Sequence, residues 1–72
     1  MCEFKVYLTE LNSEERTLLS QGIMVAIKEG NSVVLMDIIG NTQTIEDVTI
    51  KEVNTIKQEL LLLKVNSLWI KG

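Results

Sequence analysis

The sequence predicts an all-β fold, a small antiparallel barrel or sandwich, on three observations. The first nine residues alternate between apolar and polar side chains, as a strand with one buried face does. Two tight-turn signals, Gly30-Asn31 and Gly40-Asn41, divide the middle of the chain. The stretches beside these turns are rich in β-branched residues, which favour strands. Short strands between regularly spaced turns are typical of small antiparallel barrels.

The first expected strand spans Met1–Thr9 and contains the single cysteine of the chain. Its apolar face holds four side chains: Cys2, Phe4, Val6 and Leu8. Residues 10–16 are polar and turn-prone, and we expect an exposed connection there. The alternation therefore places a soft sulfur on the apolar side of the strand, beside the start of the chain.

Four further strands are expected in the middle of the chain, at 17–19, 23–29, 33–39 and 42–45. Ser20-Gln21-Gly22 ends the first of them, and the turn 29–32 precedes the strand 33–39. This strand is almost wholly apolar, with Asp37 as its one charge. Such a run predicts a central strand that is buried on much of both faces.

The last third of the chain fits two patterns. The spacing of an amphipathic helix is found in four apolar residues: Val53, Ile56, Leu60 and Leu63. Against a helix, residues 48–56 are dense in β-branched side chains, which lose rotamer freedom in helices. We therefore predict two strands, 48–56 and 59–65, joined at Lys57-Gln58.

The chain is expected to form one domain over residues 1–65, followed by an extension over 66–72. The extension is conspicuously apolar at Leu68, Trp69 and Ile70. A tryptophan in such a position predicts a clamp on the core or a dimer contact, ahead of a ligand platform.

The size of the domain favours a homodimer. A single core in a chain of 72 residues supplies only about 3–5 kcal/mol. Small domains therefore use a disulfide, a metal or a partner subunit, and one cysteine cannot close an intrachain disulfide. A second copy of the chain is the simplest remaining source of stability.

The charge pattern argues against polyanionic partners. The net charge is −3, and the basic residues are scattered along the chain, which disfavours nucleic acid and anionic membrane. We find no leader pattern and no apolar run near the ~20 residues that cross a bilayer. The expected location is the cytoplasm, where a lone thiol stays reduced.

An enzyme is not expected from these residues. The chain has no histidine, which removes the usual catalytic dyads, histidine-based zinc sites and imidazole proton relays. Its glycines stand alone, so no phosphate-binding loop is present. The adjacent carboxylates Glu14-Glu15 and Glu46-Asp47 have the pattern of solvated loop residues.

Cys2 has two interpretations. It is either a small buried hydrophobe or a metal ligand. If Met1 is removed, the amine and the sulfur of Cys2 close a five-membered chelate ring; if Met1 stays, its amine and the Cys2 amide nitrogen can join the sulfur. Both donor sets suit Ni(II) or Cu(II) better than tetrahedral Zn(II), and two chains are needed to supply four donors.

Several stretches resemble the CooT family of small nickel-binding proteins: Met1-Cys2, Lys5–Leu8, Glu29–Asn31, Val34–Gly40 and Ile50–Val53. The resemblance covers most of residues 1–65 and leaves out 66–72. It implies an SH3-like β-barrel, a homodimer, and one Ni(II) per dimer held by Cys2 of each chain. The implied role is nickel handling in the cytoplasm, for example delivery to a nickel enzyme such as carbon monoxide dehydrogenase.

Two alternatives to nickel binding remain open at this point. Relatives of this kind also carry a predicted RNA-binding label, and Tyr7 and Trp69 with neighbouring lysines are the candidate contacts, although the acidic charge argues against RNA. A plain interaction module, docking another protein through a sheet edge or the Trp69 segment, is the other. The resemblance also departs at two places, because the family pattern has a glycine near Asp47 and an aromatic residue near Ile39.

Overall fold

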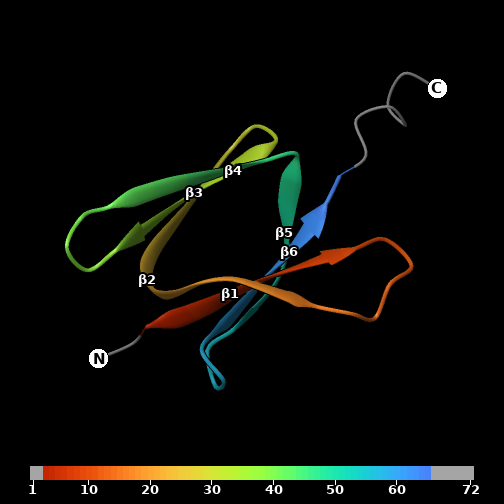
Figure 1. Cartoon of the computed structure of the whole chain (residues 1–72), viewed down its shortest axis with the longest axis horizontal. Coiled ribbons are helices and arrows are strands. Elements are labelled where there is room, and N and C mark those ends of the chain that lie inside the picture. The colour runs from red at the N-terminus through yellow and green to blue at the C-terminus, as the bar shows by residue number, and fades with distance from the viewer. Residues whose placement is uncertain (1–2, 66–72) are drawn as a thin grey trace.

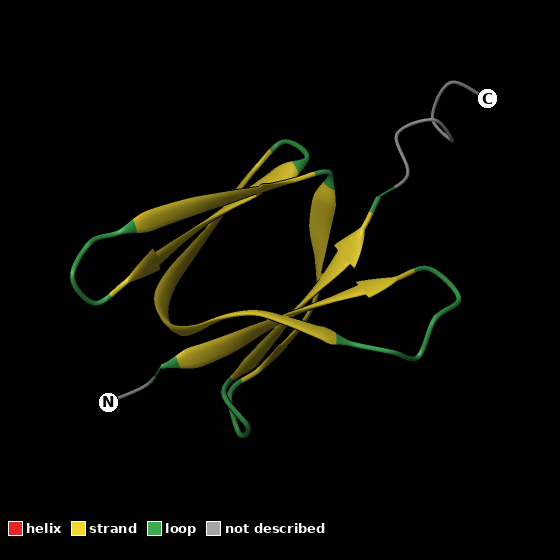
Figure 2. Cartoon of the chain, in the orientation of Figure 1, coloured by secondary structure: helices red, strands yellow, loops and turns green. Residues whose placement is uncertain are grey.

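The computed structural model describes residues 3–65 and contains six β-strands. The strands are β1 (Phe4–Glu10), β2 (Thr17–Glu29), β3 (Ser32–Asp37), β4 (Thr42–Glu46), β5 (Val48–Asn54) and β6 (Glu59–Lys64). The all-β prediction is confirmed (Figure 2), and the helical alternative for the last third is wrong. In the described part of the chain, no helix is long and apolar enough to cross a membrane.

All six strands form one sheet in the order β4-β3-β2-β1-β6-β5. The pairs β1–β2, β2–β3, β3–β4 and β5–β6 are antiparallel, whereas β1 and β6 pair in parallel and join the two halves of the chain; β4 and β5 form the two edges of the sheet. The sheet curls into a half-barrel, with β2 bending from one side to the other (Figure 1). A backbone hydrogen bond of 2.9 Å from Val48 N to Asn31 O ties the start of β5 to the β2–β3 turn.

The core lies on the concave face of this sheet. Its buried members come from five strands: Val6, Ile23, Val33, Leu35, Val48, Leu60 and Leu62. Phe4, Leu8, Leu19, Ile45 and Ile50 are partly buried and pack against it. The alternation predicted for the first strand is therefore confirmed over Phe4, Val6 and Leu8, because these three side chains all face the core.

β2 corrects the sequence prediction. Strands were expected at 17–19 and 23–29 with a break at Ser20-Gln21-Gly22, but one strand of 13 residues runs through this stretch. Gly22 has φ +72°, a left-handed conformation that glycine adopts without steric cost. Together with register shifts in the pairing of β1 with β2, it bends the strand rather than ending it. The long bent strand is what allows one sheet to wrap around a core.

The ends of β3 and β5 also differ from the prediction. β3 was expected to reach Ile39 but ends at Asp37, and β5 was expected to reach Ile56 but ends at Asn54. Both strands end for the same reason. The oxygen of a short side chain accepts hydrogen bonds from the backbone N–H groups that follow it, which turns the chain out of the sheet. Asp37 Oδ1 accepts from the N–H groups of Ile39 (3.1 Å) and Asn41 (2.9 Å).

Asn54 makes the equivalent turn between β5 and β6. Its Oδ1 accepts from the N–H groups of Ile56 at 3.1 Å and Lys57 at 3.0 Å. Gln58 closes this turn with φ +58°. The prediction of two strands joined near Lys57-Gln58 is confirmed, with a turn that begins earlier than expected.

Asp37→Ala is expected to lower the free energy of unfolding by about 1–2 kcal/mol, because the carboxylate satisfies two backbone donors of the β3–β4 turn. Urea unfolding followed by circular dichroism measures the change. Glu52→Ala, at an exposed position of β5, serves as the control and is expected to stay within ~0.5 kcal/mol of the parent. Equal unfolding midpoints for the two variants would contradict this role of Asp37.

Candidate metal centre

The two predicted metal ligands, Met1 and Cys2, lie outside the described residues, as does Trp69. Tyr7, the remaining predicted contact, lies in the middle of β1. Among residues 3–65, no three His, Cys, Asp or Glu side chains gather in a way that could hold a metal ion. The structure does describe the surface around Glu3 and Phe4, the residues that follow Cys2 in the sequence.

The start of β1 is held from both sides. Phe4 pairs with Ile23 of β2 and packs against the core, so one neighbour of the strand is fixed. On the other side, the backbone N–H of Lys5 donates to the carbonyl oxygen of Gln58 at 3.0 Å. Glu3, at this fixed strand start, directly follows Cys2 in the sequence.

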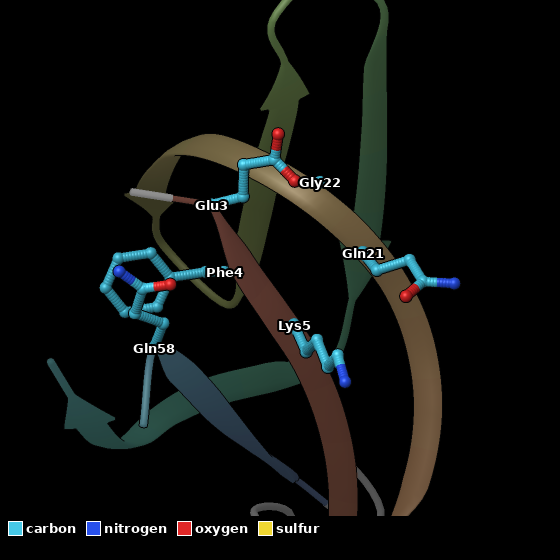
Figure 3. Close-up of a pocket in the computed structure, with 6 residues that line it drawn as sticks. All are labelled: Glu3, Phe4, Lys5, Gln21, Gly22 and Gln58. Atoms are coloured by element: carbon cyan, nitrogen blue, oxygen red, sulfur yellow. The ribbon is translucent and has the colours of Figure 1, made fainter. Parts of the chain in front are cut away.

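A shallow cavity of about 240 Å³ adjoins this strand start. Its lining comes from β1, β2 and the β5–β6 turn: Glu3, Phe4, Lys5, Gln21, Gly22 and Gln58. Figure 3 shows the Phe4 ring beside the Gln58 amide and the Glu3 carboxylate over Gly22. An added Cβ on Gly22 would come 4.0 Å from Glu3 Oε1, which is ordinary van der Waals contact. The cavity is therefore open and polar, with one acidic and one basic side chain at its edge.

Exposed isoleucines lie on the β3–β4 and β5–β6 turns, on either side of this strand start, and we call Ile38, Ile39 and Ile56 the isoleucine rim. Their exposed fractions are 59%, 78% and 93%. Ile23 pairs with both Phe4 and Asp37, which brings the β3–β4 turn to the strand start. The β5–β6 turn reaches it through Gln58; in Figure 1 the β3–β4 turn lies at the left and the β5–β6 turn at the bottom, on either side of the start of β1.

Sequence reasoning missed the isoleucine rim because it assigned these residues to strands. The available signal was an Asp or Asn one or two residues before each exposed isoleucine, at Asp37 and Asn54. Large apolar side chains held outward by ordered turns are a feature of interaction surfaces.

Tyr7 lies on the convex face of the sheet, opposite the core. The guanidinium carbon of Arg16 is 5.7 Å from the centroid of its ring, and Arg16 Nη1 is 3.2 Å from Glu59 Oε1. The cation above Tyr7 is therefore paired with a carboxylate. Phe4, the other aromatic residue between 3 and 65, packs against the core. In the described part of the chain, the aromatic residues do not combine with basic residues into a stacking platform.

Comparisons with known proteins place this geometry in a family. The sequence profile described as CO dehydrogenase accessory protein CooT matches residues 1–63. The chain belongs to the CooT family. The match includes Cys2 and nearly all of the described sheet, and it ends before the extension 66–72.

A solved structure shares the fold of this CooT family member. The crystal structure of a protein assigned as CooT from Carboxydothermus hydrogenoformans matches with a TM-score of 0.74 and 20% sequence identity. The match covers 90% of this chain and 100% of that chain. The comparison with curated proteins gives no match. The predicted resemblance to the CooT family is thus confirmed, and the family is one of CO dehydrogenase accessory proteins.

Proposed function

We propose that the protein is a cytoplasmic Ni(II)-binding homodimer that supplies nickel to a CO dehydrogenase. The observation that carries this proposal is the CooT match over residues 1–63, which includes Cys2. Nickel is the cargo here, since CO dehydrogenase is a nickel enzyme and its accessory proteins serve that enzyme. The curled sheet is, in this proposal, a barrel of the SH3-like type.

The donor chemistry of the chain start supports nickel as the cargo. Cys2 supplies a thiolate, and the terminal amine or the backbone amide nitrogen beside it supplies nitrogen. Two such N,S pairs complete a plane of four donors, a geometry that Ni(II) favours and Zn(II) does not. Each protomer contributes half of this set, so one Ni(II) binds per dimer.

The isoleucine rim supports dimerisation at the end of the molecule that leads to Cys2. Ile39 and Ile56 are 78% and 93% exposed and flank the start of β1. Burying these side chains against a second copy removes apolar area from water and brings the two chain starts together. The dimer also stabilises a small domain, and Ni(II) that binds only the folded dimer stabilises it further.

Titration with Ni(II) tests the proposal. The purified protein is expected to develop thiolate-to-metal charge-transfer absorption that saturates at about half an equivalent of Ni(II) per chain. Saturating Ni(II) is also expected to raise the melting temperature, because the metal binds the folded dimer. Native mass spectrometry reports the subunit number, the metal count and the presence of Met1 in one spectrum.

Cys2→Ser is the decisive variant in this titration. It is expected to lose the charge-transfer absorption and the melting-temperature shift while keeping the fold of the parent. Met24→Ser, which changes another sulfur, is the matched control and is expected to bind Ni(II) like the parent. Tight Ni(II) binding by Cys2→Ser, or equal loss in both variants, would overturn the assignment.

A further inference from the structure

The two edge strands of the sheet, β4 and β5 (Figure 1), differ in how they are protected against other strands. β5 has a register shift between Ile50 and Glu52, and its middle carries the charges of Lys51 and Glu52. Bulges and charged side chains of this kind are the usual protection of a sheet edge. β4 pairs with β3 in one continuous register and is uncharged over Thr42–Ile45, so it has neither protection there.

The backbone of β4 presents hydrogen-bonding groups on its outer side. In an antiparallel ladder, every second residue bonds to the neighbouring strand. The Asp37 N–H donates to the Asn41 carbonyl at 3.1 Å, which fixes the phase of this alternation, so Gln43 and Ile45 bond to β3. The remaining residues of β4 direct their N–H and C=O groups outward: Thr42, Thr44 and Glu46. Among residues 3–65, no strand pairs with this outer side.

The side chains of these three residues are exposed and begin a face that continues over β3 and β2, opposite the core. The face consists of three rows across the strands: Thr42-Met36-Val25, Thr44-Val34-Ile27 and Glu46-Ser32-Glu29. The first two rows are uncharged, and Val25 and Ile27 are 36% and 46% exposed. The third row holds the exposed carboxylates of Glu29 and Glu46. The β4 edge is therefore uncharged over most of its length and acidic at one end.

We propose that an extended segment of a partner protein pairs with β4 as an added strand and carries a basic residue opposite Glu46. Outward N–H and C=O groups at strand spacing are matched by the backbone of another strand, which decides the kind of occupant. The carboxylates of Glu29 and Glu46 favour a cation at one end of that strand. The uncharged rows favour β-branched residues along the rest of it.

A partner strand matches this edge better than a second copy of β4 does. An antiparallel pair of two β4 strands centred on Thr44 sets Glu46 of each copy opposite Thr42 of the other. Such a pair supplies no cation for either carboxylate, whereas a basic partner strand does. The surface proposed here uses none of the nickel donors, so it is a second function of the fold and does not depend on metal binding.

An NMR titration of the isotope-labelled, metal-free full chain tests the proposal. The probe is the synthetic peptide acetyl-Lys-Val-Thr-Val-Thr-amide, which places its lysine opposite Glu46 when it pairs antiparallel with β4. The amides of Gln43 and Ile45 already bond to β3 and are expected to keep their exchange rates. Downfield amide shifts and slower hydrogen exchange are expected at the outward N–H groups: Thr42, Thr44 and Glu46.

Charge reversal separates specific pairing from nonspecific adhesion. Glu46→Lys is expected to weaken binding of the lysine peptide about threefold and to favour, by the same factor, a peptide with glutamate in place of lysine. Glu52→Lys, an exposed position on β5, is the matched control and is expected to bind the lysine peptide like the parent. Thr44→Pro removes one outward N–H and no bond to β3, so it is expected to keep the fold and to weaken both peptides about tenfold.

Three results would overturn the proposal. The first is the absence of shifts at these three amides or equal preference of Glu46→Lys and the parent for the two peptides. The second is slow exchange of the three amides in the free protein at every concentration, which would mean that the chain itself covers β4. The third is slow exchange that appears only at high protein concentration, which would assign the edge to a second copy. Nickel binding by the parent is expected to be unchanged in all of these cases.

Discussion

Leu62→Ala is expected to lower the free energy of unfolding by about 2–5 kcal/mol, the largest effect of any single truncation considered. Leu62 is 0% exposed and lies at the centre of the core, between strands β1 and β5. Removing its branched end leaves a cavity that the surrounding strands cannot fill. A domain of this length has roughly 4–11 kcal/mol in total, so the variant is expected to lose about half of its stability.

Urea unfolding of Leu62→Ala measures this loss as a lower transition midpoint at unchanged slope. Leu11→Ala removes the same atoms from a side chain that is 70% exposed and is the matched control. It is expected to change the stability by ~0.5 kcal/mol or less. Similar losses in both variants would mean that the concave face is not the core.

Ile39→Glu is expected to raise the dissociation constant of the proposed dimer by about 30-fold or more, which corresponds to ~2 kcal/mol. The two-fold axis brings the introduced carboxylates of both copies near one another, and each would be buried among apolar side chains. Ile56→Glu, on the β5–β6 turn at the other side of the strand start, is expected to act in the same direction.

Sedimentation over a range of protein concentrations measures this dissociation. Ile27→Glu, which adds the same charge at an exposed isoleucine away from the rim, is expected to leave the dimer intact. If Ile39→Glu and Ile27→Glu sediment alike, the isoleucine rim is not the dimer face. If Ile39→Glu becomes monomeric yet still binds half an equivalent of Ni(II), the rim joins two copies without serving the metal.

Local patterns predicted most of the fold, and they failed where one residue overrode its neighbours. The alternation of apolar and polar residues predicts correctly that Phe4, Val6 and Leu8 face the core. The high content of β-branched residues predicts correctly that the last third of the chain forms strands. From the sequence alone Gly22 reads as the end of a strand, because its ability to bend a strand depends on a sheet that only the folded chain provides. The sequence pattern predicts Asp37 as a charge within a strand, whereas its carboxylate accepts the hydrogen bonds of the β3–β4 turn.

The candidate site was predictable only in its chemistry. The sulfur of Cys2 and its neighbouring nitrogen donors follow from the residue types, and the family assignment is confirmed by the match over residues 1–63. The isoleucine rim was not predictable, because it depends on two turns that are distant in sequence and that the pairing of β1 with its neighbours places on either side of the strand start. The departure from the family pattern at Asp47 is accommodated, because Asp47 adopts φ +62°, where glycine is the usual residue.

The parallel pairing of β1 with β6 has a consequence for how the protein is made. Partners in this ladder, from Lys5 with Glu59 to Glu10 with Lys64, are more than 50 residues apart. Closing so long a loop is slow. Domains in which contacts between distant parts of the sequence dominate fold in about milliseconds to seconds. A ribosome that has released only the first five strands therefore holds a nascent chain whose first strand lacks one neighbour. Folding is completed after translation of β6, and any pause before that point prolongs exposure of an unpaired edge to aggregation.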